Sequence, residues 1–207
     1  MSEPWNDNRF AIVPAAGLSQ RMGQPKLMLP LGSGTVIERV VTELKRASFL
    51  PVVVVRPDQH DLQRLVRDTG AMDLELPSRT THMRETVEFA LTVLSTKYHC
   101  RPEIPWLLVP ADHPLLDATI IQRLEAALGC RPDCSLAVPV YQGRRGHPLM
   151  LRWKHYQGIR SFDKNQGINA YLRQLPHETL EVVVDTPDIL VDLDTPDDYA
   201  RIRRKWG

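Results

Sequence analysis

Cysteine is scarce in this sequence, whose 207 residues contain only three, at positions 100, 130 and 134. An odd number of cysteines makes a poor disulfide framework, and reducing compartments keep thiols free. Cys130 and Cys134 could share a helix end and hold a metal, but no Cys/His pair completes a tetrahedral set at the usual spacings. The sequence therefore predicts no disulfide framework, and it gives the three thiols no evident role.

Long hydrophobic runs are also missing. The longest apolar run in the first half, Pro51 to Val55, is far shorter than the roughly 18 residues that a membrane-spanning helix needs. Residues 1–8 are polar and lack the apolar segment of a signal peptide. We therefore expect a cytoplasmic protein with no membrane partner, in which residues 1–9 form a flexible N-terminus and residues 10–207 a single domain.

The chain has no excess of charge of either sign. Its 26 Lys and Arg residues are balanced by 25 Asp and Glu residues, for a formal net charge of +1. Such a balance does not indicate a nucleic-acid partner, although a local basic cluster is compatible with it. The hydrophobic share of 43% and the charged share of 25% are ordinary for a globular protein, and the length suffices for one α/β domain with a sizeable core.

Short apolar runs alternate with amphipathic segments through residue 128. The apolar runs are typical of strands buried on both faces of a parallel sheet, and the amphipathic segments place one apolar stripe on a helix. Strands are expected at 10–14, 51–55, 73–76 and 106–109, and helices at 36–47, 58–68, 84–96 and 119–128. The alternation predicts an α/β fold with a mostly parallel central sheet and helices on both faces.

The remainder of the chain follows a different pattern. Two extended runs flank the Gly-rich stretch 142–146, which predicts a small β-hairpin near 137–151. Beyond it we expect a short helix at 167–175, a strand at 180–185, an extended run at 189–194 and a terminal helix at 196–205 capped by Thr195.

The loop after the first strand, Pro14-Ala-Ala-Gly-Leu-Ser-Gln-Arg-Met-Gly-Gln-Pro-Lys26, has the composition of an anion-binding site. Its small residues let backbone N–H groups approach an anion, while Arg21 and Lys26 add cations and Ser19 adds a hydroxyl donor. It matches neither G-x-x-x-x-G-K-[ST] nor G-x-G-x-x-G. An ordinary turn whose basic residues face water has the same composition, so the residues alone leave both interpretations open.

The spacing Ala-Ala-Gly-x-Ser-x-Arg-Met-Gly-x-x-Lys resembles the signature loop of the MobA-like NTP transferases, the molybdopterin cytidylyl- and guanylyltransferase family. The following stretch, from Lys26 to Gly32, is similar to that family as well. The resemblance implies a Rossmann-like nucleotidyltransferase fold and a loop that wraps the NTP, with Arg21 and Lys26 stabilising charge on the departing pyrophosphate. By this resemblance the nucleotide-binding residues are Ala15, Ala16, Gly17, Ser19, Arg21, Gly23 and Lys26.

A carboxylate follows the buried strand at 106–109, in Val109-Pro-Ala-Asp-His-Pro114. Ligands of open α/β sheets bind at the carboxyl ends of strands, and an aspartate there can hold Mg²⁺, although it can also merely cap a turn. The segment resembles the family's Asp-x-Pro motif, which implies that Asp112 is a catalytic metal ligand. His113 occupies a variable position of that motif and receives no catalytic role.

The segment Val191-Asp-Leu-Asp-Thr-Pro-Asp-Asp198 resembles the family's terminal D-x-D/N-T-P-E/D-D motif. The resemblance implies that Asp192 completes the Mg²⁺ site, with Asp194 as the adjacent candidate. Asp197 and Asp198 fit a simpler interpretation, because acidic residues in a first helical turn are stabilised by the helix dipole.

Gly143-Arg-Arg-Gly-His-Pro148 resembles the family's R-G-H/N-P hairpin, which faces the acceptor pocket. By that resemblance Arg145 and His147 bind the phosphate of the acceptor, and a solvated hairpin tip is the alternative. The stretch 163–169 resembles an acceptor-side motif only in part, because Asn169 stands where an arginine is more usual.

One segment departs from the family pattern. Where the family carries a Gly-Met-Ser-Ser-Ser-like turn that contacts the nucleoside, this chain has Thr81-His-Met-Arg-Glu-Thr86. Met83 and the hydroxyl of Thr86 remain, whereas the glycine is lost and Arg84 and Glu85 are bulkier. The identity of the base is therefore left open by this turn.

The resemblance implies a Mg²⁺-dependent transfer of a nucleoside monophosphate from an NTP to a phosphorylated acceptor, with release of pyrophosphate. CTP rather than GTP and molybdopterin are favoured, because the Pro-Ala-Ala-Gly opening and the Arg-Arg-Gly-His-Pro hairpin look more like the cytidylyl branch. A molybdoenzyme or a chaperone would be a compatible partner. The alternatives are a nucleotidyltransferase for a sugar or alditol phosphate and a non-catalytic protein that binds a nucleotide or cofactor.

Overall fold

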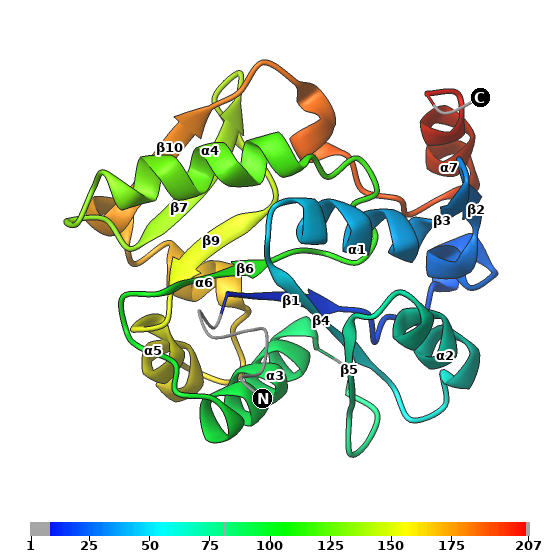
Figure 1. Cartoon of the computed structure of the whole chain (residues 1–207), viewed down its shortest axis with the longest axis horizontal. Coiled ribbons are helices and arrows are strands. Elements are labelled where there is room, and N and C mark those ends of the chain that lie inside the picture. The colour runs from blue at the N-terminus through cyan, green and yellow to red at the C-terminus, as the bar shows by residue number, and fades with distance from the viewer. Residues whose placement is uncertain (1–8, 81, 206–207) are drawn as a thin grey trace, which may run out of the picture.

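The computed structural model describes residues 9–80 and 82–205, so the expectation for a flexible N-terminus lies almost wholly outside the described residues. A central sheet of eight strands carries helices on both faces, as Figure 1 shows. The sheet contains β1 (Phe10–Pro14), β4 (Leu50–Val55), β5 (Met72–Glu75), β6 (Pro105–Leu108), β7 (Leu136–Tyr141), β8 (Arg144–Arg145), β9 (Leu149–Arg152) and β10 (Thr179–Val183). The α/β class predicted from the alternating pattern is confirmed.

The helices follow the expected order with one addition. They are α1 (Val36–Arg46), α2 (His60–Asp68), α3 (Met83–Lys97), α4 (Ala118–Gly129), α5 (His155–Ser161), α6 (Ile168–Leu172) and α7 (Pro196–Arg203). Helix α5 was not anticipated. Helix α2 begins two residues later than expected, because Asp58 forms ion pairs with Arg56 and Arg79 instead of capping the helix. No helix in the described ranges is both long and apolar enough to cross a bilayer.

The sheet is parallel where the glycine-rich loop leaves it and mixed beyond. Strands β5, β4, β1 and β6 lie side by side in parallel, and β10 is parallel to β7. Strand β9 runs antiparallel between β6 and β7, so the predicted hairpin is built into the sheet rather than standing apart from it. Its tip, where β8 pairs with the end of β7, belongs to the same sheet and extends beyond the other strands.

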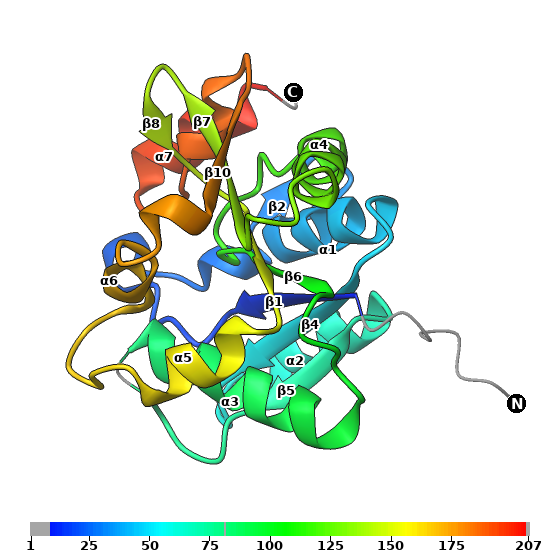
Figure 2. The same cartoon turned by 90° about the vertical axis from the view of Figure 1, so that its left-hand side faces the viewer.

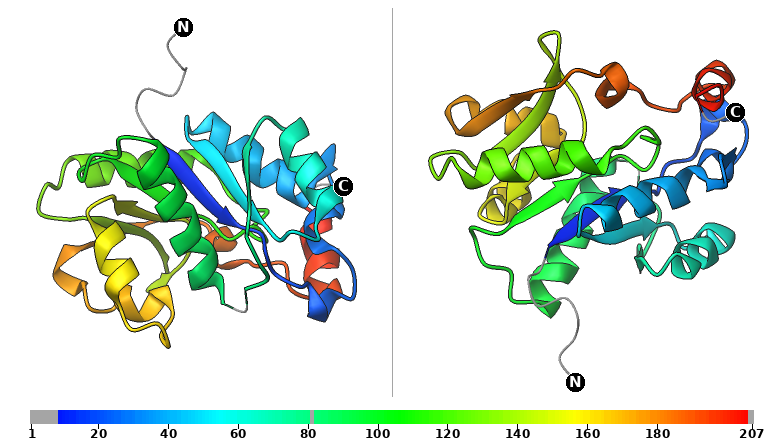
Figure 3. Two further views of the ribbon diagram at one scale, coloured as in Figure 1. Left: turned by 90° about the horizontal axis from the view of Figure 1, so that it is seen from below. Right: turned by 45° about the horizontal axis from the view of Figure 1, so that its top comes forward.

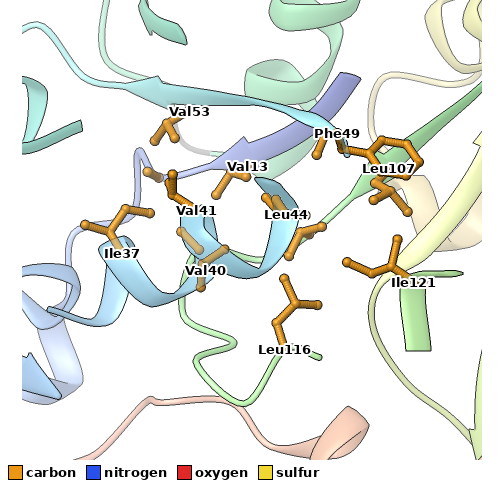
Figure 4. Close-up of a cluster of buried hydrophobic side chains, with 14 of the residues drawn as sticks. Val13, Ile37, Val40, Val41, Leu44, Phe49, Val53, Leu107, Leu116 and Ile121 are labelled. Atoms are coloured by element: carbon orange, nitrogen blue, oxygen red, sulfur yellow. The ribbon is translucent and has the colours of Figure 1, made fainter. Parts of the chain in front are cut away.

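Alternate side chains of each central strand enter two separate cores, as the period of two along a strand requires. Val13, Val53 and Leu107 pack against α1 and α4, and Figure 4 shows them facing Val40 and Ile121. Their neighbours along the strands face α3, α5 and α6 on the opposite side of the sheet. Figures 2 and 3 show these two helical layers on either side of the sheet. Burial on both faces explains why β4 is an uninterrupted apolar run.

Short strands and turns connect the helical layers to the C-terminal segment, residues 184–203. Strands β2 (Pro30–Leu31) and β3 (Gly34–Thr35) form a small antiparallel pair beside α7, where the hydroxyl of Tyr199 donates to the carbonyl of Pro30 at 2.6 Å. The chain between β10 and α7 forms the short 3₁₀ turn Pro187–Leu190 and then runs extended to Thr195. This path carries the acidic residues at 192 and 194 back to the end of β6, where the N–H of Leu193 donates to the carbonyl of Asp112 at 2.8 Å.

Candidate functional site

The glycine-rich loop leaves the carboxyl end of β1 and bends sharply twice. Ser19 and Gly23 have positive φ angles of 49° and 66°, one on each side of the short 3₁₀ turn Gln20–Met22. From the end of the neighbouring strand, the guanidinium of Arg56 donates to the carbonyls of Ala16 and Gly17 at 2.9 and 2.7 Å. Arg56 thereby holds these carbonyls on its own side of the loop.

The backbone N–H groups of the same loop remain available. Within residues 9–80 and 82–205, those of Ala16, Gly17 and Leu18 donate to no protein acceptor. Consecutive free N–H groups in a tight turn form a concave anion site, especially where the carbonyls point elsewhere. The loop therefore carries three consecutive N–H groups with no protein acceptor among the described residues.

Lys26 ends this loop and lies between two carboxylates. Its Nζ is 2.5 Å from Oδ2 of Asp112 and 2.9 Å from Oδ1 of Asp194, although the three residues are far apart in sequence. Burial by itself would lower the pKa of Lys26, but the hydrogen bonds and charges of Asp112 and Asp194 outweigh it and raise that pKa above its ordinary value. The ammonium therefore stays charged at neutral pH.

Asp194 also contacts the second cation of the loop. Its Oδ2 lies 3.0 Å from the guanidinium of Arg21, whose side chain is otherwise largely exposed. The structure thus brings together Arg21, Lys26 and Asp112, the three residues predicted to be catalytic, and adds Asp194 to them. Asp194 was only the secondary acidic candidate in the sequence.

A pocket of about 520 Å³ opens over these charged groups. Its lining comes from the glycine-rich loop, from Asp112 and Asp194, and from a third group of residues at and just before the start of α3, here called the facing wall. The facing wall includes Thr80, His82, Met83 and Thr86. Every predicted nucleotide-binding residue lines this pocket except Gly23, which lies on the other side of the loop among the residues of a second pocket.

The unusual turn at the start of α3 does not fill the pocket. The side chain of Arg84 is 5% exposed and points away from the pocket, toward α5 and the segment that follows it. There its guanidinium donates to the carbonyls of four residues, which are Ile159, Phe162, Asp163 and Gln166. Arg84, which is bulkier than the family pattern, therefore packs inside the protein, and Met83 and Thr86 still line the pocket.

Asp192, predicted to be the second metal ligand, lies beside the pocket rather than in its lining. Its Oδ1 is 3.5 Å from Nδ1 of His113, which is fully buried next to Asp112. Contact with His113 is the main cause that holds the pKa of Asp192 below its ordinary value, and the charges of His147 and Lys26 act in the same direction. Asp192 is therefore ionised and half-exposed near the Lys26 cluster.

The two residues predicted to bind the acceptor have different environments. Arg145 is exposed on β8, outside the lining of the pocket, and pairs with Glu181 of β10 at 2.8 Å. His147 is mostly buried, and its ring stacks edge-on against His113 with centroids 5.9 Å apart. Burial, followed by the nearby His113, lowers the pKa of His147 to about 4. The structure does not bring these two side chains together.

The chemistry of the acidic residues fits a hard divalent cation. In the described ranges no group of three or more His, Cys, Asp or Glu side chains is arranged to hold a metal by itself. Asp112 and Asp194 nevertheless share one positive charge, the Lys26 ammonium, between two carboxylate oxygens. Mg²⁺ commonly binds to one or two carboxylates and takes its other ligands from water and substrate phosphates. The three cysteines are free thiols at 100, 130 and 134 and take no part in this site.

Sequence reasoning missed Arg56 and Thr80, whereas His82 belongs to the stretch aligned with the family's nucleoside-contacting turn. Arg56 follows β4 directly, and β4 is the parallel neighbour of β1, so the strand ends alone could have placed this arginine beside the glycine-rich loop. No comparable signal existed for Thr80, because it lies in an irregular segment whose path depends on packing.

Comparison with known proteins gives a consistent picture. Residues 11–179 match the family model of the MobA-like NTP transferase domain. The molybdenum cofactor cytidylyltransferase of Escherichia coli (strain K12) is 24% identical over 196 residues, which cover 94% of this chain and 95% of that protein. The molybdenum cofactor guanylyltransferase of Mesorhizobium japonicum is 28% identical over an alignment of 209 positions that covers 93% of each chain.

Solved structures share the fold at low sequence identity. A nucleotidyl transferase from Methanothermobacter superposes with a TM-score of 0.76 at 21% identity, covering 95% of this chain and 96% of that one. A protein from Mycobacterium tuberculosis H37Rv, solved as a complex with manganese, has a TM-score of 0.72 at 21% identity, covering 94% and 97% of the two chains. These likenesses show that the fold is that of nucleotidyltransferases.

Proposed function

Because this chain belongs to the MobA-like NTP transferase family and is a nucleotidyltransferase, we propose that it transfers CMP from CTP to molybdopterin, releasing pyrophosphate in a Mg²⁺-dependent reaction. The observation that carries the proposal is the arrangement around Lys26. A largely buried ammonium, two carboxylates and a loop with free N–H groups line one pocket of about 520 Å³. Such a site suits a triphosphate and the charge that builds up during its cleavage.

The residues of this site act by positioning and by electrostatic stabilisation. Nucleotidyl transfer is an attack of an acceptor phosphate oxygen on the α-phosphorus, and it needs no protein nucleophile, since the acceptor phosphate is already ionised. The N–H groups of Ala16, Gly17 and Leu18 would hold phosphate oxygens. Lys26 and Arg21 would neutralise the charge that grows on pyrophosphate as the bond to the α-phosphorus breaks.

Asp112 is proposed to hold Mg²⁺ together with Asp192, and the contact of Asp194 with Lys26 makes Asp194 a third carboxylate of the same cluster. A bound Mg²⁺ would supply charge neutralisation on the phosphates. The manganese complex of the Mycobacterium tuberculosis neighbour supports a divalent cation in proteins of this fold. Comparing Asp192→Asn with Asp194→Asn in Mg²⁺ titrations of turnover would tell which carboxylate completes the site.

Arg145 and His147 are proposed to serve the acceptor. Arg145 is exposed and pairs with Glu181 in a surface ion pair, which is weak enough to exchange for an acceptor phosphate. His147 is largely buried, so it would act through its edge and through the backbone of the hairpin more than as an exposed cation. A molybdoenzyme or chaperone that receives the product would be a compatible partner.

The preference for CTP is supported by the cytidylyltransferase relative and by the two sequence segments that look like the cytidylyl branch. Pyrophosphate release, measured with each of the four NTPs and Mg²⁺, tests the proposal, with molybdopterin, a sugar phosphate and an alditol phosphate as acceptors. We expect release with CTP and molybdopterin to exceed every other pair. Release only with a sugar or alditol phosphate would move the protein to another branch, and tight NTP binding without release would make it a binding protein.

A further inference from the structure

Asp194 holds both cations that the proposed reaction needs on the phosphates. Its Oδ1 is 2.9 Å from the Lys26 ammonium, and its Oδ2 is 3.0 Å from the Arg21 guanidinium. Asp112 contacts the same ammonium at 2.5 Å. Neither cation can therefore meet a phosphate without leaving a carboxylate.

The two cations, Lys26 and Arg21, are in direct contact with two carboxylates, Asp112 and Asp194. The side chain of Lys26 is only 13% exposed, and it stays charged because Asp112 and Asp194 raise its pKa despite burial. A largely buried ammonium between two carboxylate oxygens occupies the place of any other cation that those oxygens could bind. The carboxylate oxygens best suited to bind a divalent cation are thus already paired with the Lys26 ammonium.

We propose that Asp194 is a positioning residue that makes nucleotide binding and divalent-cation binding mutually dependent. It holds Lys26 and Arg21 in the nucleotide-free protein, and Lys26 keeps Asp112 and Asp194 occupied until phosphates draw the ammonium away. This inference rests on the proposed function, because it assumes that a metal–NTP complex enters this pocket. It adds a role for Asp194 and a reason for coupled binding.

Simple electrostatics gives the direction of the coupling. A divalent cation alone must displace the ammonium from its carboxylates, and a triphosphate alone must bind beside two carboxylates that remain negative. When both are present, Lys26 and Arg21 pair with phosphate oxygens and release the carboxylates. By linkage, each ligand must then raise the affinity of the other by the same factor, for which about 10-fold is typical of such couplings.

The first experiment uses Mn²⁺ alone on nucleotide-free protein, with free Mn²⁺ followed by electron paramagnetic resonance. Lys26→Gln removes the competing ammonium and keeps a side chain of similar length. We expect this variant to bind Mn²⁺ about 10-fold more tightly than wild type. Lys97→Gln is the matched control, since Lys97 is exposed at the far end of α3 and should leave Mn²⁺ affinity unchanged. Equal or weaker Mn²⁺ binding by Lys26→Gln would overturn the inference.

The second experiment measures CTP affinity in EDTA and again with saturating Mn²⁺, by calorimetry. In wild type we expect Mn²⁺ to tighten CTP binding about 10-fold or more. In Asp194→Asn, metal-free CTP binding should strengthen severalfold and the gain from Mn²⁺ should shrink, because the cations are released. Asp197→Asn makes the same charge change at an exposed position of α7 and should behave as wild type.

These results separate the inference from the proposed function. Weaker metal-free CTP binding in Asp194→Asn, or an undiminished gain from Mn²⁺, would mean that Asp194 does not restrain the cations. If Asp194→Asn fails to fold, the wild-type cycle and Lys26→Gln decide alone. Pyrophosphate release without coupled binding would refute only the inference, whereas coupled binding without release under any acceptor would refute only the proposed function.

Discussion

Gly146 and Ile189 lie in direct backbone contact across two segments that are distant in sequence. A Cβ placed on Gly146 would be 2.2 Å from the carbonyl oxygen of Ile189, and the N–H of His147 donates to that same oxygen at 2.9 Å. Residue 189 belongs to the 3₁₀ turn that leads into the extended run with Asp192 and Asp194. The hairpin glycine thus determines where the acidic run enters the site.

Gly146→Ala should therefore reduce both stability and turnover. The added methyl group cannot fit, so the acidic run must shift, and overpacking of this kind costs about 1–3 kcal/mol of unfolding free energy. Denaturant unfolding and pyrophosphate release measure the two effects. Gly129→Ala is the control, because a Cβ there meets no atom within 4 Å and the position is helical. Normal turnover by Gly146→Ala would show that the contact does not position the acids.

Lys26→Ala should lower the rate of pyrophosphate release by two to three orders of magnitude, roughly the loss seen when one preorganised donor to a developing charge is removed. The fold should survive, because the ammonium lies at the pocket and not in either hydrophobic core. Release is measured under saturating CTP and Mg²⁺, and circular dichroism checks the fold. Lys97→Ala serves as the matched lysine control. An unchanged rate would remove Lys26 from the mechanism.

The fold could be predicted from the sequence to a large extent because its signals are local. The β-branched run at 51–55 can only be a strand covered on both faces, and β4 has every residue buried. The apolar stripe of 36–47 likewise gives α1, whose start is fixed by the capping box of Thr35 and Glu38. Helix α5 escaped because it is short and its sequence, His155–Ser161, has little periodicity.

The candidate site could be predicted only for residues supported by two signals, the resemblance to the family and a position at the end of a strand. The loop from Ala15 to Lys26 and Asp112 follow neighbouring parallel strands, so their convergence could be expected. The roles of Asp192 and Asp194 could not be separated, because residues two positions apart in an extended run are expected on the same face, and only tertiary packing decides which one meets Lys26. The clamp made by Arg84 was equally hidden, since its carbonyl partners lie in a segment about 80 residues away.

Arg84→Lys should destabilise the protein although it keeps the charge. The guanidinium donates to the carbonyls of Ile159, Phe162 and Gln166 at 2.7 to 2.9 Å, and also to that of Asp163, in a fork that a lysine cannot reproduce. The carbonyl of Ile159 is buried and the others are partly buried, so losing these donors should cost about 2 kcal/mol of unfolding free energy. Denaturant unfolding measures this loss.

Hydrogen exchange locates the same effect. In Arg84→Lys the amides of residues 159–167 should exchange faster, because their segment loses the side chain that ties it to α3. Arg173→Lys, at an exposed arginine just after α6, is the control and should change neither quantity. Protection of 159–167 equal to that of wild type would show that other contacts hold this segment.

Acidification should destabilise the protein through His147. Its pKa is about 4 in the folded protein against an ordinary 6.5, because burial and then the nearby His113 disfavour the imidazolium. Between these values the unfolded chain binds a proton that the folded chain does not, so unfolding becomes easier as pH falls. The contribution is fully present above pH 6.5 and is lost progressively toward pH 4, by up to about 3 kcal/mol for a shift of this size. His155, whose pKa is lowered mainly by burial, acts in the same direction.

Denaturant unfolding at several pH values from 7.5 to 4 checks this expectation, since the free energy of unfolding should drop most steeply over about two units below pH 6.5. His147→Gln introduces a neutral side chain of similar polarity that does not titrate. The variant should therefore be less stable than wild type at pH 7.5, but its free energy of unfolding should fall less on acidification. The pH dependence that remains in the variant comes from His155 and from carboxylates whose pKa values are lowered. The carboxylates act in the most acidic part of the pH range. A pH profile of His147→Gln parallel to that of wild type would contradict the expectation. It would mean that His147 takes up its proton as readily in the folded chain as in the unfolded one, so that its contact with His113 does not disfavour the imidazolium.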